Sequence, residues 1–323
     1  MLTSTRRLQA LVFLLAAAAP SVAFAQDRHI VLPVGELEPM IRSEPLRIVS
    51  AEVSRPTLRG DITLKAEVVF GERPALRVKV RNAEPGAETF NNVPRYEIAA
   101  YELQKLLLDE AEYVVPPTAL RMVPLEELRA FAPKAKPTFS GADEVLCVVQ
   151  YWLQDVEPRT DVLDSERFET DAAYARHVGQ LNVLTYLIEH ADSNPGNFLV
   201  SAEPEGARVF SIDNGVAFAS EVSDRGQLWR TMRVERLPAD IVARLRQLTE
   251  TDLMSRLGVL AQWELADGHY VAVPPADNLR SNTGVRRKPG TIQMGLTRGE
   301  IVSVVSRAKR LLRLIDDDKI STY

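Results

Sequence analysis

The sequence predicts an α+β fold, in which a strand-rich first region with one well-marked helix precedes a mainly helical second region. Three observations support this: apolar and polar residues alternate over 62–70, apolar residues recur at helical spacing from Tyr96 to Leu107, and long amphipathic stretches follow residue 170. A period of two is typical of a half-buried strand, and a period near 3.6 is typical of an amphipathic helix. We therefore expect a first region over 46–150 and a second over 151–323, as the two lobes of one large domain or as two small domains.

The first lobe is expected to begin after a lead-in, because residues 26–45 show no clear period. Strands are predicted from Leu46 onwards and clearly over 62–70 and 75–80, with a Gly- and Pro-containing turn between the last two. Val145 to Tyr151 reads as a further strand. It contains Cys147, the single cysteine of the chain, which cannot form an intramolecular disulfide and which we expect to be buried.

The helix of the first lobe has a predicted start. Asn92 can cap it, and Pro94 suits its first turn because the missing N–H would have no helical partner there. Tyr96, Ala99, Ala100, Leu103, Leu106 and Leu107 form its apolar stripe. Glu97 lies just off that stripe.

The second lobe is expected to be built from helices around one hairpin. The predicted helices cover 172–190, 239–248, 251–262 and a C-terminal stretch that begins with the capping box Thr297 and Glu300. The hairpin is predicted over 198–201 and 209–212. Residues 267–295 are expected to be a long loop.

The N-terminus has the layout of a secretory signal peptide over residues 1–25. Arg6 and Arg7 precede an apolar run from Leu8 to Pro20, and Ala23–Ala25 forms an A-x-A cleavage signal. The run is too short to span a bilayer comfortably, and no later segment is long and apolar enough to do so. We therefore expect an exported protein, periplasmic or extracellular, without a transmembrane segment after cleavage. Cleavage takes the formal charge from −5 to −7, which argues against a general nucleic-acid binder.

Polar residues cluster where the helix over 172–190 ends and where the hairpin ends. Asp192 and Asn197 lie in the loop after the helix, and Asp213 follows the second hairpin strand. Because a hairpin returns the chain to its starting point, we expect Asp213 to lie close to Asn197. Oxygen ligands of this kind suit Mg²⁺, with substrate phosphates completing its coordination.

This pattern resembles a known family. Asp-x-x-x-x-Asn, a hairpin and then Asp-x-Gly is similar to the catalytic core of protein and lipid kinases. Ile212–Phe218 looks like the metal-binding segment of type II phosphatidylinositol 4-kinases and of secretory-pathway kinases related to four-jointed and the Golgi casein kinase. The loop from Asp192 to Asn197 resembles the Asp-Arg-His-x-x-Asn loop of phosphatidylinositol kinases, and Arg95–Leu103 looks like the Glu-bearing helix of the bacterial and secretory relatives.

The resemblance covers about Leu76 to Phe218 and implies a two-lobed protein-kinase-like fold. It implies that Lys79 contacts nucleotide phosphates, that Glu97 pairs with Lys79, and that Asp192 acts as a base toward the accepting group or orients it. Asn197 and Asp213 would hold the metal. The implied cofactors are ATP with Mg²⁺ or Mn²⁺, and the implied chemistry is positioning and charge neutralisation around a phosphoryl group.

Each of these residues also has an ordinary structural interpretation. Lys79 can be a solvated lysine with Lys65 as its rival for the role, and Glu97 can be a helix-surface acid. Asp192 can be a turn residue, and Asp213 with Asn214 and Gly215 can form a hairpin turn. His190 is expected to fix the loop rather than to act as an acid or base. The charge run 286–288 is expected to be solvated, with an acidic substrate or anionic lipid as the alternative.

The sequence departs from the kinase pattern at three points. No G-x-G-x-x-G motif precedes Lys79, Arg77 stands where kinases usually keep a small residue beneath the adenine, and Ser193 replaces the Arg that commonly follows the catalytic Asp. These departures, and the scarcity of ATP outside the cytoplasm, bear on turnover more than on fold.

Three functions follow from the pattern. The first is an ATP-dependent kinase acting on a protein, sugar or lipid acceptor outside the cytoplasm. The second is a pseudokinase that serves as a binding scaffold, and the third is a metal-dependent phosphoesterase that uses the same carboxylates. Other chemistries find little support, because no H-E-x-x-H, G-x-S-x-G or P-loop motif is present.

Overall fold

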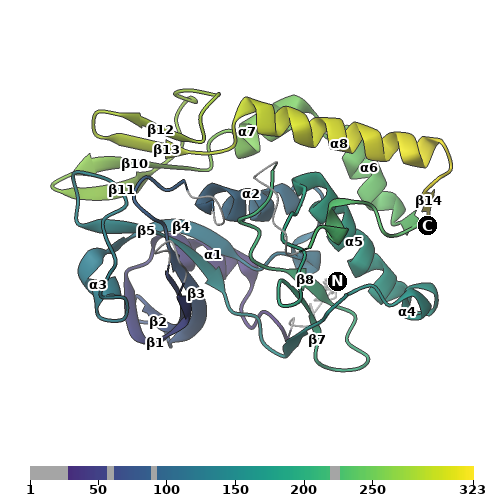
Figure 1. Ribbon diagram of the computed structural model, residues 1–323, viewed down its shortest axis with the longest axis horizontal. Coiled ribbons are helices and arrows are strands. Elements are labelled where there is room, and N and C mark those ends of the chain that lie inside the picture. The colour runs from purple at the N-terminus through teal and green to yellow at the C-terminus, as the bar shows by residue number, and fades with distance from the viewer. Residues whose placement is uncertain (1–27, 57–61, 89–92, 219–225) are drawn as a thin grey trace, which may run out of the picture.

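The computed structural model describes residues 28–56, 62–88, 93–218 and 226–323. The predicted signal peptide and the predicted cap Asn92 lie outside the described residues. The architecture is a mixture of helices and mainly antiparallel sheets (Figure 1). Within the described ranges, no helix is both long enough and apolar enough to pass through a bilayer.

The first region is built on a five-stranded antiparallel sheet with the strand order β1-β2-β3-β5-β4. Its strands are β1 (Leu46–Pro56), β2 (Ile62–Phe70), β3 (Leu76–Asn82), β4 (Thr118–Pro124) and β5 (Glu144–Tyr151). The strands expected over 62–70, 75–80 and 145–151 are confirmed within one or two residues.

One face of this sheet packs against two helices, α1 (Val34–Ser43) and α3 (Leu125–Arg129). The interpretation of 26–45 as a lead-in without a period is therefore wrong. Leu37, Met40 and Ile41 of α1 are almost fully buried. The helix is only ten residues long and contains Pro39. Its apolar residues therefore repeat too few times for the helical period to stand out in the sequence. Cys147 is buried on this side, as expected.

The opposite face of the sheet packs against α2 (Pro94–Gln104), which lies near the centre of the molecule (Figure 1). Val93 is the N-cap and offers no side-chain bond, while Pro94 occupies the first turn as predicted. Every residue of α2 is buried, because the helix also contacts α5 (Ala172–Ile188) and α7 (Glu250–Leu257). The sequence predicted one buried apolar stripe on this helix, whereas in the structure the polar residues outside that stripe are buried as well.

The second region contains the expected helices and hairpin. Beyond α5 and α7 these are α6 (Ala239–Gln247), α8 (Arg298–Asp316) and the strands β7 (Phe198–Ser201) and β8 (Val209–Ser211). The capping box of Thr297 and Glu300 at the start of α8 is confirmed. The region also holds α4 (Ser165–Thr170), β6 (Val156–Pro158) beside β7, and the short parallel pair β9 (Arg236–Leu237) and β14 (Ser321–Thr322).

The expected long loop over 267–295 is wrong, as is the expected helix over 251–262 beyond Leu257. These residues form a four-stranded antiparallel sheet with the order β11-β10-β13-β12, drawn at the upper left of Figure 1. Its strands are β10 (Ala261–Ala266), β11 (His269–Val273), β12 (Val285–Lys288) and β13 (Thr291–Met294). The strands are short and mostly polar or exposed along β11 and β12, so they carry little of the alternation that marks a strand.

Arg286 of β12 is fully buried, contrary to the expectation of a solvated charge run over 286–288. Its guanidinium donates hydrogen bonds to the carbonyl oxygens of Gly258 at 2.6 Å, Leu296 at 2.9 Å and Arg280 at 2.8 Å. Gly258 follows the last residue of α7. Arg286 therefore ties the end of that helix to the four-stranded sheet.

Replacing Arg286 with Ala should lower the free energy of unfolding by about 3 kcal/mol, because three charge-assisted hydrogen bonds are lost and the Leu296 carbonyl loses its donor. Urea unfolding followed by circular dichroism measures this. Lys288→Ala on the same strand is the matched control: Lys288 is exposed, so the change should stay within about 0.5 kcal/mol. Equal unfolding midpoints for the two variants would contradict this account of the sheet.

Candidate functional site

Strand β3 presents two cations toward α2. Lys79 and Arg81 are two residues apart and therefore share one face of the sheet, and both are buried, at 6% and 8% exposure. Lys65, the rival of Lys79, is exposed on β2. A solvated lysine at position 79 is thus excluded, and the two buried cations need anionic partners.

Helix α2 supplies the first anion. Glu97 is 1% exposed, and its Oε1 accepts from Lys79 Nζ at 3.3 Å and from an Arg81 Nη atom at 3.1 Å. Its Oε2 accepts from the backbone N–H of Asn214 at 2.9 Å. Glu97 is therefore not a surface acid, and it links β3 to the segment that follows β8.

Asp213 supplies the second anion. Its carboxylate accepts a hydrogen bond from Lys79, and an Nη atom of Arg81 lies 3.8 Å away. Burial opposes ionisation, but Lys79 and Arg81 outweigh it and hold the pKa of Asp213 well below its ordinary range. About a third of the Asp213 side chain is exposed, against 8% for Lys79. Asp213 is thus the most open member of this group of four, which we call the charge cluster: Lys79, Arg81, Glu97 and Asp213.

The backbone of Asp213 explains how the segment turns. Asp213 has φ +55°, a left-handed conformation that Asp tolerates better than most residues. The hydrogen bond from Asn214 N–H to Glu97 then fixes the residue after it. The Ser211 hydroxyl donates to Asn214 Oδ1 at 2.8 Å, which closes the turn locally. The sequence indicated a turn at these residues, but it did not indicate the hydrogen bond from the Asn214 N–H to Glu97 of α2.

The loop after α5 lies beside this segment, as predicted. The Ile212 N–H donates to the carbonyl of Asn197 at 2.9 Å, and the Ala191 N–H donates to that of Val216 at 2.9 Å. These bonds place Asn197 next to the residue that precedes Asp213. The hairpin thus brings together two regions that the sequence separates.

Within the loop, Asn197 and Asp192 are bonded to each other. Asn197 Nδ2 donates to the carbonyl of Asp192 at 2.9 Å and to its Oδ2 at 3.0 Å, and Asn194 Nδ2 donates to Asp192 Oδ1 at 2.7 Å. Gly196 has φ +102°, which allows the tight return of the chain. Asn197 Nδ2 is thus engaged by Asp192, and the remaining polar atom of the amide is the oxygen Oδ1.

This donor set fits a hard divalent cation. The carboxylates of Asp213 and Asp192 and the amide oxygen of Asn197 are all oxygen donors, the class that Mg²⁺ and Mn²⁺ prefer. Across the described residues, no group of three or more His, Cys, Asp or Glu side chains is placed to hold a metal. Asn197 together with oxygen atoms of a ligand or of water would have to complete the coordination.

His190 fixes this loop from inside the protein. It is fully buried, its Nδ1 accepts from the Asp192 N–H at 3.3 Å, and its ring lies 5.5 Å from that of Phe198. Burial lowers the pKa of His190 to about 4, so the ring is neutral at pH 7. These contacts favour the expected structural role.

Helix α2 is held in place by the C-terminal region. Arg95 donates to Glu300 at 2.7 Å, and the hydroxyl of Tyr96 donates to the same carboxylate. Glu300 also accepts from the Thr297 N–H at 2.7 Å as part of the capping box of α8. One carboxylate thus caps α8 and anchors the first turn of α2, and Glu97 lies in that turn.

Arg81 is the member of the charge cluster that sequence reasoning missed. Its signal was its spacing, because a residue two positions after Lys79 on a strand must share its face. Arg77, two positions before Lys79, shares the face as well, but its side chain is 61% exposed and donates to Glu67 at 3.0 Å. The structure thus brings the five predicted residues into two neighbouring groups. Lys79 contacts both Glu97 and Asp213, and Asp192 contacts Asn197.

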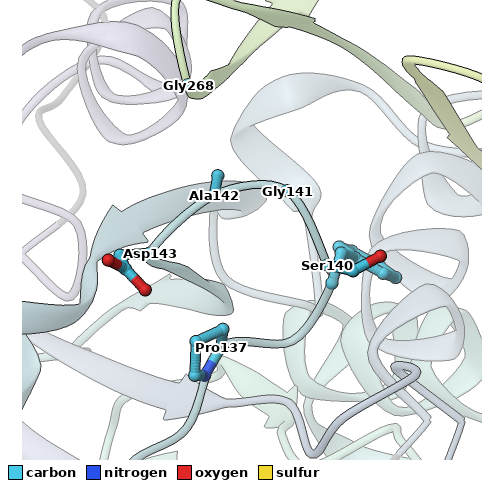
Figure 2. Close-up of a pocket in the computed structure, with 7 residues that line it drawn as sticks. Pro137, Ser140, Gly141, Ala142, Asp143 and Gly268 are labelled. Atoms are coloured by element: carbon cyan, nitrogen blue, oxygen red, sulfur yellow. The ribbon is translucent and has the colours of Figure 1, made fainter.

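A hollow on the surface lies elsewhere. It is lined by the loop 137–143 and by Gly268 of the β10–β11 turn, as Figure 2 shows. That loop ends where β5 begins at Glu144, six residues along the strand from Gln150, which pairs with Lys79. At about 3.3 Å per residue the two points are about 20 Å apart. The hollow is thus separate from the charge cluster.

The buried histidine makes the stability of the protein depend on pH. Unfolded His190 binds a proton below its ordinary pKa near 6.5, whereas the folded residue does so only near pH 4. The unfolded state therefore binds more protons between these values, and stability falls as the pH drops through this window. From pH 7 to pH 5 the loss due to one such histidine is about 2 kcal/mol.

Urea unfolding at both pH values measures this, with His190→Gln as the test variant. The variant should lose about 2 kcal/mol less than the wild type on acidification. Burial also lowers the pKa of His177 to about 4, so a residual dependence should remain in the variant. Identical pH dependence in the two proteins would contradict the buried, neutral state of His190.

Comparison with protein-family models and with curated protein sequences gives no match to either. A function for the chain is therefore inferred from the geometry of the charge cluster and of the loop 191–197 beside it.

Proposed function

We propose that the chain is an exported kinase-like phosphotransferase with a two-lobed protein-kinase-like fold. It transfers a phosphoryl group from ATP to a protein, sugar or lipid acceptor outside the cytoplasm. The observation that carries the proposal is the position of Lys79, whose ammonium lies between the carboxylates of Glu97 and Asp213. Kinases use a lysine on the third strand, a glutamate on the following helix and a metal-binding aspartate in this relation.

The order of the elements adds support. Lys79 lies on β3, Glu97 on the helix between β3 and β4, and Asp213 directly after the β7–β8 hairpin. If these residues were ordinary solvated or turn-forming residues, nothing would require them to lie together. Instead, Lys79 forms direct ion pairs with Glu97 and Asp213, and the Lys79 and Glu97 side chains are only 8% and 1% exposed. Burying such charges costs desolvation free energy and is stable only with good geometry.

Each residue then has a task in the transfer. The Lys79 ammonium neutralises phosphate oxygens, and Glu97 keeps it in place. Asp192 accepts the proton of the acceptor hydroxyl as the new O–P bond forms and the bridging O–P bond to ADP breaks. Asn197 and Asp213 would hold Mg²⁺ or Mn²⁺, which would supply charge neutralisation at the phosphates.

A second candidate, a pseudokinase that binds without turnover, is favoured by one observation. Lys79 and Arg81 together compensate Glu97 and Asp213 within the cluster. The site is therefore electrically balanced before any metal is present, and Lys79 and Arg81, which both contact Oδ1 of Asp213, compete with a metal for the charge of that carboxylate. Thermal-shift measurements with ATP and metal distinguish the candidates, since stabilisation without turnover would favour the pseudokinase.

Asp192→Ala and Asp213→Ala should each lower phosphoryl transfer from ATP at least about a hundredfold, because they remove the proton acceptor and a metal ligand. Release of ADP by the purified protein with Mg²⁺ or Mn²⁺, tested over protein, sugar and lipid acceptors, measures the transfer.

Asp277→Ala is the control for both substitutions, since Asp277 is exposed and should leave the rate unchanged. Circular dichroism would establish that the variants remain folded. Unaltered transfer in folded Asp192→Ala and Asp213→Ala proteins would rule out the kinase proposal.

A further inference from the structure

The open side of the charge cluster is the face that β2 and β3 share. Lys65 lies opposite Lys79 and Glu67 lies opposite Arg77 in the strand register, and residues paired in this way project from the same face. Lys79 and Arg81 are covered, whereas the Arg77 side chain is 61% exposed and that of Glu67 is 37% exposed. A ligand anchored at Lys79 and Asp213 would therefore extend over Lys65, Glu67 and Arg77.

This surface is unsuited to a nucleobase. Pockets for flat organic rings are lined mainly by apolar and aromatic side chains. The side chains that a ring would cover on this surface, Lys65, Glu67 and Arg77, are all charged. A ring placed over the pair of Arg77 and Glu67, 3.0 Å apart, would stack on the guanidinium but would also take the Glu67 carboxylate out of water without giving it a donor.

The aromatic ring and amides beside this surface are also engaged. The Lys65 ammonium lies 5.5 Å from the ring centroid of Trp152, and the backbone N–H of Trp152 donates to the carbonyl of Arg77 at 3.2 Å. On the neighbouring strand, Gln150 Nε2 donates to the Thr118 hydroxyl at 2.9 Å. These groups would have to break existing contacts before they could bind the face or the edge of a base.

The same surface suits phosphate. Lys65 and Lys79 are like charges directly opposite each other, an unfavourable pairing that Glu52, opposite Lys65 on β1, offsets only in part. Lys79 has carboxylate partners, whereas Lys65 forms no ion pair with any carboxylate of the described residues. An oligophosphate running from Asp213 and Lys79 toward Lys65 and Arg77 would place its oxygens beside both exposed cations, where charge-assisted hydrogen bonds are strongest.

We propose that the site recognises its ligand through a metal-bound chain of phosphates and has no selectivity for a base. This inference rests on the proposed function, because it requires that the charge cluster bind metal and phosphate. It identifies the ligand class as oligophosphates, with or without a nucleoside attached.

Isothermal titration of the wild-type protein with the magnesium complexes of ATP, GTP and inorganic tripolyphosphate tests the proposal. Dissociation constants that agree within fivefold are expected. A preference of fivefold or more for either nucleotide over tripolyphosphate overturns this inference and leaves the phosphotransferase proposal standing. Failure of all three complexes to bind at millimolar concentration overturns the phosphate site, and the proposed function with it.

Variants locate the contact. Lys65→Ala and Arg77→Ala should each weaken all three complexes by the same factor, up to about fivefold for a partly exposed charge pair. Arg73→Ala is the matched control, because Arg73 is an exposed arginine that pairs with Glu44 outside this surface. Weakening of the nucleotides alone, or equal weakening by Arg73→Ala, would overturn the assignment of the phosphates to Lys65 and Arg77.

Discussion

The contact between Lys79 and its two carboxylates is the interaction on which the rest of the site depends. A buried ammonium is tolerated only with anionic partners, so β3, α2 and the segment after β8 must meet at one point. Glu97 joins all three, because it accepts from Lys79, from Arg81 and from the N–H of Asn214. Removing any one partner would leave an uncompensated charge in the interior, which is why the cluster also fixes the relative positions of these elements.

The C-terminal region extends this constraint. Glu300 caps α8 and binds the first turn of α2, and Arg286 secures the end of α7, which packs against α2. Helix α2 is therefore enclosed on all sides, and Glu97 has little freedom to leave Lys79. A site built in this way is preorganised before a ligand arrives, so less of the binding free energy is needed to order it.

The sequence predicted those helices and strands whose signal lies within a single element. Alternation located β2 and helical spacing located α2 and α5, because each reflects burial along a single element, and the capping box located the start of α8, because it reflects hydrogen bonds within one turn. The four-stranded sheet of β10–β13 was missed because its strands are short and Arg286 is buried through contacts distant in sequence. Arg81 was missed for a similar reason: its spacing from Lys79 was visible, but its need for Glu97 arises only when α2 packs on the sheet.

The central claim is that the charge cluster and the neighbouring loop form a site for a metal-bound phosphate chain. Water proton relaxation with Mn²⁺ and tripolyphosphate tests it most directly, because Mn²⁺ held by the protein tumbles slowly and enhances the relaxation rate. The account predicts enhancement with the wild-type protein and its loss in a folded Asp213→Asn variant. No enhancement with the wild type, or equal enhancement in the variant, would contradict it.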